Sequence, residues 1–508
     1  MNTSSTKRTV WQYIIALLRY FSKPKRFNLK FLILNLALAS TLVVALDYAE
    51  DFVFFKEIKD TSLDWIMYWH SDFEPKLANG QPMQRMALFE IDDQTYREWG
   101  SPVLTPRDKL KALIEAAEKG GANVIAVDIG LSWAQDGCIH QAEKTPACPT
   151  ASPKAADESL AKYLQAINES QTAPLIILTR TYRHPLENGV VNQKHFLTRL
   201  PSFLDNYITE EKNVFWSSTF FVVDADRVRR RWQLASLVCQ DNHLTVVPSM
   251  QLLVALAQLY ATDDSTREAA QVIQQFKNRL NHWANTLPCD ASQGTTIPRL
   301  CQQQACPPLF VELPTKAGIS DKLHQVDLAG GRETERVVYR FAPPDTLDPN
   351  RLSFIIKKSA RHVLAAGADV YQRIVLIGGT HQDTRDKHPV PIRIKDVDGI
   401  YIVANAIDTL LRFGQFQTQP VEDKLIVSVV LIVFVTLIFT FFDIVFALVL
   451  STVLLGLLVL WSFQALHHGM EIDVALRLLA IQALYFMLRV FGIWKFLQDI
   501  LKGENHHA

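Results

Sequence analysis

The sequence shows no excess of either charge: its 508 residues include 52 lysines and arginines and 52 aspartates and glutamates. Nucleic-acid-binding proteins usually carry an excess of basic residues, so we expect no nucleic-acid partner. Cysteine is scarce as well, with six residues. The closest pair, Cys301 and Cys306, has no matching pair of histidines, which argues against a zinc site. We therefore expect no metal and no other cofactor.

Charge is also missing from two long stretches near the end of the chain. Leu425–Phe442 and Ile444–Leu466 contain no charged residue, and only Asp443 separates them. A helix needs about 20 consecutive apolar residues to cross a bilayer. The two stretches therefore predict transmembrane helices at 424–442 and 444–466.

A third apolar run, Ile472–Phe491, is interrupted by Arg477 and Arg489 and predicts a span over 472–493. A charge in the middle of a bilayer costs about 2.5–3.5 kcal/mol on insertion scales. Two explanations stay open. Each arginine extends to its nearer interface, or one of them pairs with an acid, either Asp443 or a residue on a partner's helix.

One apolar run lies near the N-terminus, at Phe31–Leu46, and predicts a first span over 29–49. The leader, 1–28, holds basic residues and no acid, so it should stay in the cytoplasm, with a helix on the membrane surface. A cleaved signal peptide is the alternative, but Asp47 follows the run without a clear cleavage motif. With four spans, the tail 494–508 is cytoplasmic too.

The six cysteines support this topology, because all of them fall in 50–423, the segment expected outside the cytoplasm. An even number confined to one compartment is typical of disulfides in an oxidising space. Buried free thiols are the alternative. Six cysteines allow 15 pairings, of which Cys138–Cys148 is the simplest. The candidates are Cys138, Cys148, Cys239, Cys289, Cys301 and Cys306.

The segment 50–423 opens with a strand–helix–strand pattern. Met86–Ile91 and Asn123–Val127 are apolar runs that each lead into aspartate. The helix between them begins at Pro106-Arg107, ends at Gly120-Gly121, and has apolar residues at Leu110, Leu113, Ile114 and Ala117. That spacing is helical, and the order predicts a right-handed unit with parallel strands.

The rest of the segment continues this pattern. Strands are expected at 174–179, 215–223 and 373–377, and helices from Pro248 and from Ile400. Residues 261–335 read as a disulfide-bearing insertion packed on the sheet, and 134–158 as an exposed loop. The fold class is therefore α/β: a periplasmic, mainly parallel sheet with flanking helices, plus four transmembrane helices.

The order of these motifs resembles the type-two CHASE domain, a sensory extracellular domain associated with bacterial cyclases and histidine kinases. The resemblance is carried by Ala87–Asp93, Pro106-Arg107, Gly121–Asp128, Val223–Arg230, Arg373–Gly378, Asp386–Pro391 and Gly399–Ala406. It covers most of 50–420. It implies a multi-pass protein of a bacterial inner membrane, because members commonly place three membrane helices after the domain.

Members of that family usually continue into a cytoplasmic cyclase, kinase or phosphatase. This sequence ends about 15 residues after its last predicted helix, whereas a folded domain needs at least about 50 residues. We therefore expect no catalytic output domain, and a signal that passes to a separate protein.

Polar residues follow several predicted strands, and parallel α/β sheets bind ligands at the carboxyl ends of their strands. The residues expected to form such a pocket are Asp92, Asp93, Arg107, Asp128, Gly378, Gly379, Thr380, Asp386 and His388. Carboxylates and histidine suit a cation, whereas arginine and glycine amides suit an anion. The alternative is structural: an aspartate after a strand often caps the next helix, and an arginine–aspartate pair fixes a loop.

Two further motifs have a functional and a structural interpretation. Asp396-Val397-Asp398-Gly399 has the spacing of a haloacid-dehalogenase phosphatase loop, but its polar surroundings favour a turn before a helix. Arg227, Arg229, Arg230 and Arg231 form a basic run. A solvated strand edge is the favoured interpretation, and binding of an acidic envelope polymer the alternative.

These observations predict a non-enzymatic sensor that responds to a small periplasmic ligand or an envelope protein. A structural subunit of an envelope complex is the alternative. A periplasmic hydrolase using Asp92, Asp128 and His388 is a weaker one. The expected partners are the lipid bilayer, a separate signalling or envelope protein, and a second copy of the chain. Small and polar residues on the first helix favour that self-association: Asn35, Ala37, Ala39, Ser40 and Thr41.

Overall fold

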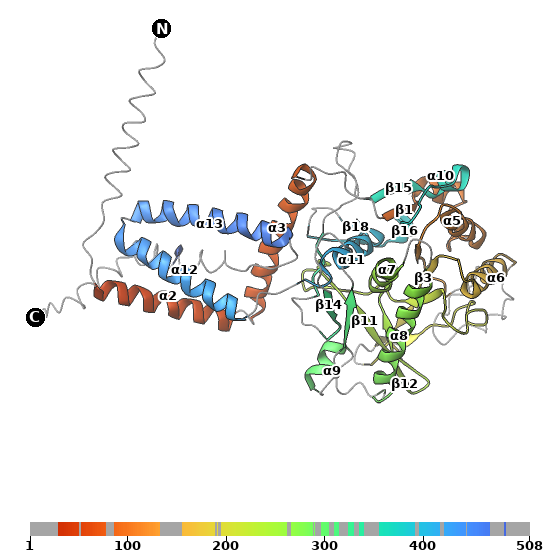
Figure 1. The fold of residues 1–508 in the computed structure, drawn as a ribbon, viewed down its shortest axis with the longest axis horizontal. Coiled ribbons are helices and arrows are strands. Elements are labelled where there is room, and N and C mark those ends of the chain that lie inside the picture. The colour runs from red at the N-terminus through yellow and green to blue at the C-terminus, as the bar shows by residue number, and fades with distance from the viewer. Residues whose placement is uncertain are drawn as a thin grey trace, which may run out of the picture. The chain divides into compact units, whose positions relative to one another are not determined.

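The structure is a computed structural model that divides into two compact units. One unit comprises the chain ends, 1–66 and 417–508, and the other comprises 67–416. The residues described are 29–49, 52–77, 86–132, 155–187, 190–191, 195–261, 266–287, 289, 296–303, 309–313, 324–329, 335–339, 355–391, 396–416, 421–442, 444–467 and 482–483. Figure 1 shows the elements of each unit.

Six parallel strands form the sheet at the centre of the 67–416 unit, in the order β15-β1-β16-β2-β3-β8. They are β1 (Met86–Ile91), β2 (Val124–Asp128), β3 (Leu175–Thr179), β8 (Val214–Ser217), β15 (Ile355–Ser359) and β16 (Ile374–Gly379). Four are apolar over nearly their whole length, as expected of strands covered on both faces. The late strand β16 lies between β1 and β2, so the sheet joins segments about 250 to 290 residues apart.

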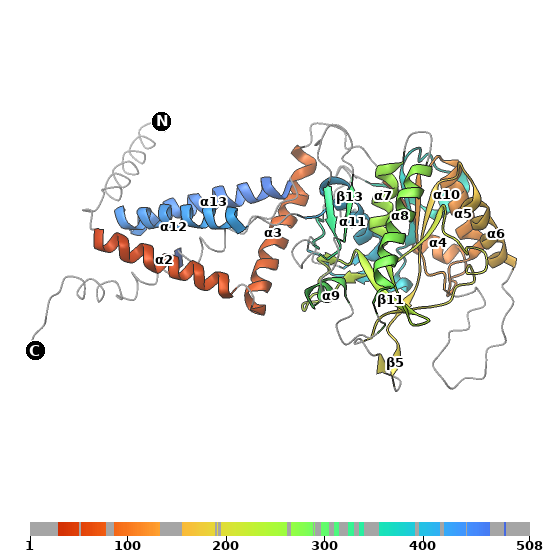
Figure 2. The ribbon, with the colours of Figure 1, turned by 60° about the horizontal axis from the view of Figure 1, so that its bottom comes forward.

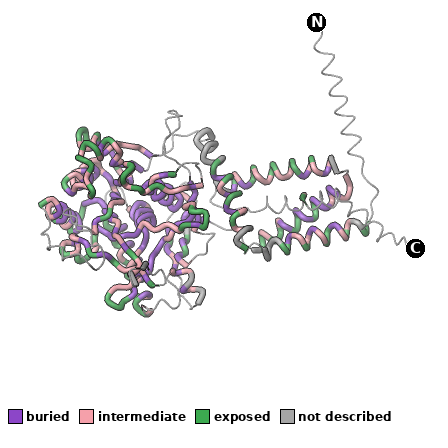
Figure 3. Tube along the Cα trace, turned by 180° about the vertical axis from the view of Figure 1, so that it is seen from behind, coloured by how far each residue is buried: buried purple, intermediate pink, exposed green. Residues whose placement is uncertain are grey.

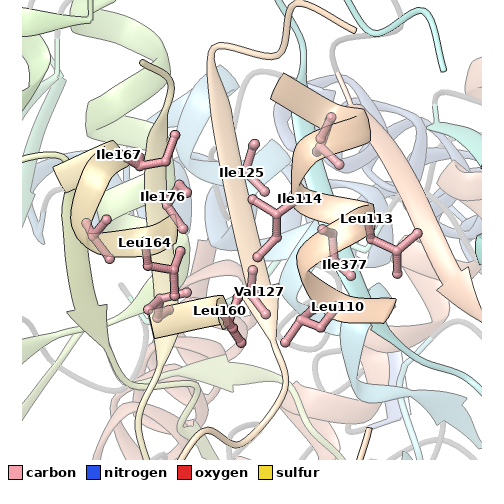
Figure 4. Close-up of a cluster of buried hydrophobic side chains, with 14 of the residues drawn as sticks. Leu110, Leu113, Ile114, Ile125, Val127, Leu160, Leu164, Ile167, Ile176 and Ile377 are labelled. Atoms are coloured by element: carbon pink, nitrogen blue, oxygen red, sulfur yellow. The ribbon is translucent and has the colours of Figure 1, made fainter. Parts of the chain in front are cut away.

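One face of the sheet carries α5 (Arg107–Lys119), α6 (Ala155–Glu169) and α10 (Ala360–Ala366). Alternate residues of each strand point to this face, because side chains alternate along a strand. Figure 4 shows Ile125, Val127 and Ile176 from the strands against Leu113 and Leu164 from the helices. The predicted apolar stripe of α5 is confirmed, since all four of its residues are fully buried.

The opposite face carries α7 (Met250–Tyr260) and α11 (Gly399–Phe413), which contact each other as well as the sheet. The helix α8 (Arg267–Ala284) packs on α7 and on strand β12, and its Lys277 reaches the edge strand β8. Figure 2 separates α5 and α6 from α7 and α8 on the two sides. Figure 3 shows the buried residues gathered between these layers.

Short elements complete the described part of this unit. The helices are α4 (Asp93–Glu98), α9 (Ile297–Gln303) and the 3-10 turn η2 (Gln382–Thr384). The two-stranded sheets pair β4 (Tyr182–Arg183) with β7 (Thr198–Arg199), β5 (Leu186–Glu187) with β6 (Val190–Val191), β9 (Phe221–Val222) with β10 (Arg231–Trp232), β11 (Ala235–Gln240) with β12 (His243–Pro248), β13 (Phe310–Leu313) with β14 (His324–Asp327), and β17 (Lys387–His388) with β18 (Val397–Asp398).

The α/β class and the parallel sheet are confirmed, but two local expectations are wrong and two elements were missed. The expected strand 215–223 is two strands, β8 and β9, which belong to different sheets. The predicted loop 134–158 ends too late, because α6 begins at Ala155 and buries Asp157 completely. Strand β15 was not predicted, since only two of its five residues are apolar and it lies at the sheet edge. Helix α3 (Val53–Leu77) was also not predicted.

Cys239 and Cys289 form a disulfide that joins β11 to the segment after α8. Cys301 is disulfide-bonded too, and none of the described cysteines is free. The alternative of free thiols is therefore wrong for these three. Cys138, Cys148 and Cys306 lie outside the described residues.

The unit formed by the chain ends contains α2 (Leu29–Ala49), α12 (Val421–Phe441) and α13 (Ile444–His467). Of the described helices, two are long and apolar enough to cross a membrane, at Glu422–Phe441 and Phe446–Ala465. The apolar part of α2, Leu32–Ala45, is shorter than a full span. The leader, the predicted span at 472–493 and the tail fall outside the described residues, apart from 482–483.

Helix α2 packs against α12 through apolar side chains that include Ala39, Val43 and Val435. Asn35 is buried and donates a hydrogen bond from Nδ2 to Thr440 Oγ1 at 3.0 Å. Asn35 and Ala39 therefore face α12 of the same chain. Of the residues expected to mediate self-association, Ala37 and Thr41 remain exposed.

Candidate functional site

The candidate site lies at the carboxyl ends of the central strands. Strand register aligns Glu90, Gly378 and Asp128 in one row across β1, β16 and β2. Because residues in register point to the same face, the side chains of Glu90 and Asp128 both point towards α11. Gly378 has no side chain between them, and a Cβ at this position would collide with Ile400 of α11.

A cavity of about 300 Å³ opens beside Asp128. The loop that carries β17 contributes Asp386 and His388, whose Oδ1 and Nε2 atoms are 2.7 Å apart. Gly399, the first residue of α11, closes the wall: its N–H donates to the backbone oxygen of Asp386 at 2.8 Å. A Cβ on Gly399 would collide with the Asp386 carboxylate, so glycine allows this close approach.

Burial and the nearby charge of Asp386 raise the pKa of Asp128 to about 7, although a hydrogen bond from Thr179 Oγ1 at 3.3 Å opposes the shift. An ordinary aspartate titrates near 4. Asp128 therefore changes its protonation state in the neutral range, so it can present either a neutral or a charged group to the cavity.

Arg229 lines the same cavity and was not predicted to be a site residue. Its guanidinium donates to the Phe221 oxygen at 3.0 Å, and its backbone N–H donates to the Pro389 oxygen at 2.9 Å. Burial lowers the pKa of Arg229 while the charge of Asp386 raises it. Only the density of the basic run in the sequence hinted at this role.

Two predicted site residues, Asp92 and Asp93, lie away from the cavity. Asp92 caps α4 by accepting a hydrogen bond from the Thr95 N–H at 2.7 Å, which confirms the structural alternative. Burial tends to raise the pKa of Asp92, but its hydrogen bonds with Thr95 hold the pKa below the usual value. Asp93 accepts from the Gln382 N–H at 2.9 Å and so holds the turn η2.

Gly378 and Thr380 also have a role in the packing of the sheet and do not contact the cavity. Gly378 separates Glu90 from Asp128, and the Thr380 N–H donates to the Ile91 oxygen at 3.1 Å. Of the nine residues predicted to form the pocket, the cavity brings together three, Asp128, Asp386 and His388, and Gly379 does not line it.

Arg107 is on the other face of the sheet, so its predicted place in the pocket is wrong. Its side chain is completely buried, with Nε 3.5 Å from Asp157 Oδ1 and the guanidinium 5.4 Å from the centre of the Phe203 ring. Burial lowers the pKa of Arg107, and the charge of Asp157 counteracts this. The pair holds α5 to α6.

The basic run at 227–231 is not a solvated strand edge. Arg230 and Arg231 are buried, and both form ion pairs with the buried Asp224. Arg230 also pairs with Asp226 at 2.6 Å. Only Arg227 is exposed, in a turn with φ of 67°. The arginines of this run therefore hold a loop together and leave Arg229 at the cavity.

The motif from Asp396 to Gly399 does precede a helix, but as the short strand β18, which leads directly into α11, and not as the favoured turn. Asp396 is exposed, and Asp398 lies in the two-residue strand β18, outside the parallel sheet. A phosphatase nucleophile needs the tip of a buried parallel strand, which this motif does not provide. Asp443, Arg477 and Arg489 lie outside the described residues.

Comparison with protein families gives a match over most of the chain. The model of the CHASE2 domain matches residues 36–441. The chain belongs to the CHASE2 domain family. Comparison with curated proteins found no match, and comparison with solved structures found none either.

CHASE2 domains are sensory extracellular domains, and the cavity of this CHASE2 chain is lined by charged side chains of both signs. Asp128 and Asp386 supply carboxylates, and Arg229 supplies a fixed cation on the facing side. Such a lining matches a small polar molecule that carries both signs of charge. Among the described residues, no group of three or more His, Cys, Asp or Glu side chains is arranged to hold a metal ion.

Proposed function

We propose that this CHASE2 chain is a non-enzymatic sensor of a bacterial inner membrane whose extracytoplasmic unit binds a small zwitterionic or cationic molecule. The cavity formed by Asp128, Asp386, His388 and Arg229 carries this proposal. Its volume of about 300 Å³ is at the lower end of small-molecule sites. The ligand is therefore about the size of an amino acid.

The proposed route of the signal runs through the helices of the chain ends. The segments before and after the sensory unit lead into α2 and α12, which pack against each other. A ligand shifts such a pair only if it binds two arrangements of the sensory unit with different affinity. A separate membrane or envelope protein then detects the shift. In the proposed topology both termini lie in the cytoplasm, α2 is the first span and 472–493 is the fourth.

The test uses the full-length protein in lipid nanodiscs and measures thermal unfolding with amino acids, dicarboxylates, polyamines and divalent cations. At 100 times its dissociation constant, a ligand stabilises the folded state by about 2.7 kcal/mol. We expect at least one compound to raise the melting temperature of the wild-type protein. We expect Asp128→Asn and Arg229→Gln to abolish the shift.

The matched control is Asp108→Asn, which removes an exposed carboxylate on α5 and should keep the shift. If no compound shifts the wild-type protein, or if the shift survives both cavity variants, the proposed site is wrong. Stoichiometric co-purification with other envelope proteins in that case would favour a structural role. Turnover of phosphate or ester substrates would contradict the non-enzymatic assignment.

A further inference from the structure

The edge strand β8 runs beside a second, larger cavity of about 900 Å³. On the side of β8 that faces away from β3, the neighbouring strand is β12. These two strands meet at their carboxyl ends. There the Ser218 N–H donates to the Pro248 oxygen at 3.2 Å, and the Met250 N–H donates to the Ser218 oxygen at 2.8 Å. Trp216 and Val247 both line the cavity, so the strands diverge from this junction and leave a gap.

The open edge of β8 presents backbone groups that a further strand would pair with. Asn213 and Ser217 accept hydrogen bonds from β3 through their backbone oxygens. Because alternate residues of a strand bond to opposite neighbours, the N–H and C=O of Trp216 point away from β3 and into the gap.

Side chains cover these groups in place of a strand. The Trp216 N–H donates to Glu211 Oε1 and Lys277 Nζ donates to the Trp216 oxygen, each at 3.4 Å. Both distances are at the long limit for a hydrogen bond. Glu211 and Lys277 pair with each other. Across the gap, Asn281 Oδ1 accepts from the Val246 N–H of β12 at 3.0 Å.

The lining of this cavity has an excess of positive charge, with five basic side chains against two carboxylates. Arg199 on β7 and Arg267 at the start of α8 are both exposed. The disulfide Cys239–Cys289 ties the β11–β12 hairpin to the segment after α8, so two walls of the gap are covalently joined. An open edge is a template for strand addition, and here the walls beside it are fixed and basic.

We propose that this gap binds an extended, acidic segment of a partner protein, which adds to the sheet as a strand beside β8. The main chain of the segment bonds to the N–H and C=O of Trp216, and the side chains of Glu211 and Lys277 move aside. Acidic side chains of the segment face Arg199 and Arg267. This surface shares no residue with the Asp128 cavity, so it gives the sensor a separate contact for a protein.

The test starts from full-length protein in nanodiscs and a displayed library of random decapeptides. We expect selection to enrich acidic peptides. A synthetic copy of the best peptide should bind the double variant Arg199→Glu, Arg267→Glu at least about tenfold more weakly, because facing like charges oppose binding. The matched control is Arg97→Glu, Lys119→Glu, which reverses two exposed charges on α4 and α5 and should leave binding unchanged.

Hydrogen exchange then locates the bound peptide. We expect amides in 214–217 to exchange at least about tenfold more slowly with peptide bound, because the Trp216 N–H gains a main-chain partner. The proposal fails if no peptide is enriched over empty nanodiscs. It also fails if the Arg199 and Arg267 double variant binds as well as the control. It fails too if the bound peptide leaves the exchange of the amides of β8 unchanged. These outcomes do not bear on the Asp128 cavity, which thermal shift with small molecules tests.

Discussion

Several buried charges in the 67–416 unit pair with oppositely charged side chains away from the cavity. Arg107 is completely buried beside Asp157, and Arg230 and Arg231 are buried around Asp224. Removing one partner from such a pair leaves an uncompensated charge in the interior. Asp128 differs from these, because the charge that shifts its pKa belongs to Asp386, which has the same sign and lines the same cavity.

We expect Arg107→Ala to lower the free energy of unfolding by about 3–5 kcal/mol, since Asp157 stays buried without its arginine. Urea unfolding followed by tryptophan fluorescence measures this. Arg97→Ala, at an exposed position of α4, should change stability by less than about 0.5 kcal/mol. The double variant Arg107→Leu, Asp157→Leu should be less destabilised than Arg107→Ala. A loss for Arg107→Ala no larger than that of Arg97→Ala would contradict the role of the pair.

Asp128 should make stability depend on pH. Its pKa is about 7 in the folded chain, against 3.8 for an unperturbed aspartate. Between these values the folded chain binds more protons than the unfolded chain, so the contribution of Asp128 to stability is full below pH 4 and is lost as pH rises to 7. The Asp128→Asn variant cannot ionise at this position, so its stability relative to the wild-type protein should increase as pH rises from 5 to 8. Urea unfolding at pH 5 and at pH 8 measures the free energy of unfolding of both proteins. A difference between variant and wild type that is the same at both pH values would refute the prediction.

At the scale of elements, the two cavities arise where packing between neighbouring elements is interrupted. The smaller cavity exists because Gly378 and Gly399 let α11 and the β17 loop approach the strand ends. The larger one exists because β12 leaves the edge of β8 after a single junction. The Cys239–Cys289 disulfide holds the hairpin that contains β12 to the segment that follows α8.

We expect Cys239→Ser, Cys289→Ser to lower the free energy of unfolding by roughly 2–4 kcal/mol, because the bond closes a loop between residues 50 apart in sequence. Urea unfolding of the oxidised proteins measures the loss. In the variant, amides of β12 should also exchange faster, since one wall of the gap is no longer tied. Unchanged stability and unchanged exchange would show that packing alone holds the hairpin.

At the scale of the whole molecule, the chain ends form one unit and the sensory fold is inserted between them. Many apolar side chains of α12 and α13 are exposed, among them Leu425 at 64 % and Leu460 at 64 %. Large exposed apolar surfaces require a partner or a lipid environment. Together with the disulfides of the 67–416 unit, this favours a membrane location for one unit and an oxidising compartment for the other.

We expect alkaline phosphatase fused after Asn242, in the exposed turn between β11 and β12, to be active in cells. Alkaline phosphatase forms its disulfides only after export from the cytoplasm, so its activity reports an extracytoplasmic position. A fusion at Ala508 should be inactive, and green fluorescent protein fused there should be fluorescent. An inactive fusion at Asn242 together with an active fusion at Ala508 would reverse the proposed orientation.

The sequence by itself determined the class of the fold, the position of its main strands and the two apolar spans near its end. These depend on local patterns: runs of apolar residues, helical spacing and the turn residues that end each element. The family also followed from the sequence, because the order of short motifs is preserved along the chain.

Only the tertiary structure decided which polar residues meet. Asp92 follows β1 and Asp128 ends β2, yet Asp92 caps a helix and Asp128 lines a cavity. The difference depends on β16 lying between β1 and β2, and on where α11 and the β17 loop pack against them. Arg229 lines the cavity that was expected to contain Arg107, whereas Arg107 is buried beside Asp157. Asp128 meets Asp386 only because segments far apart in the sequence pack together, and no local pattern encodes such a contact.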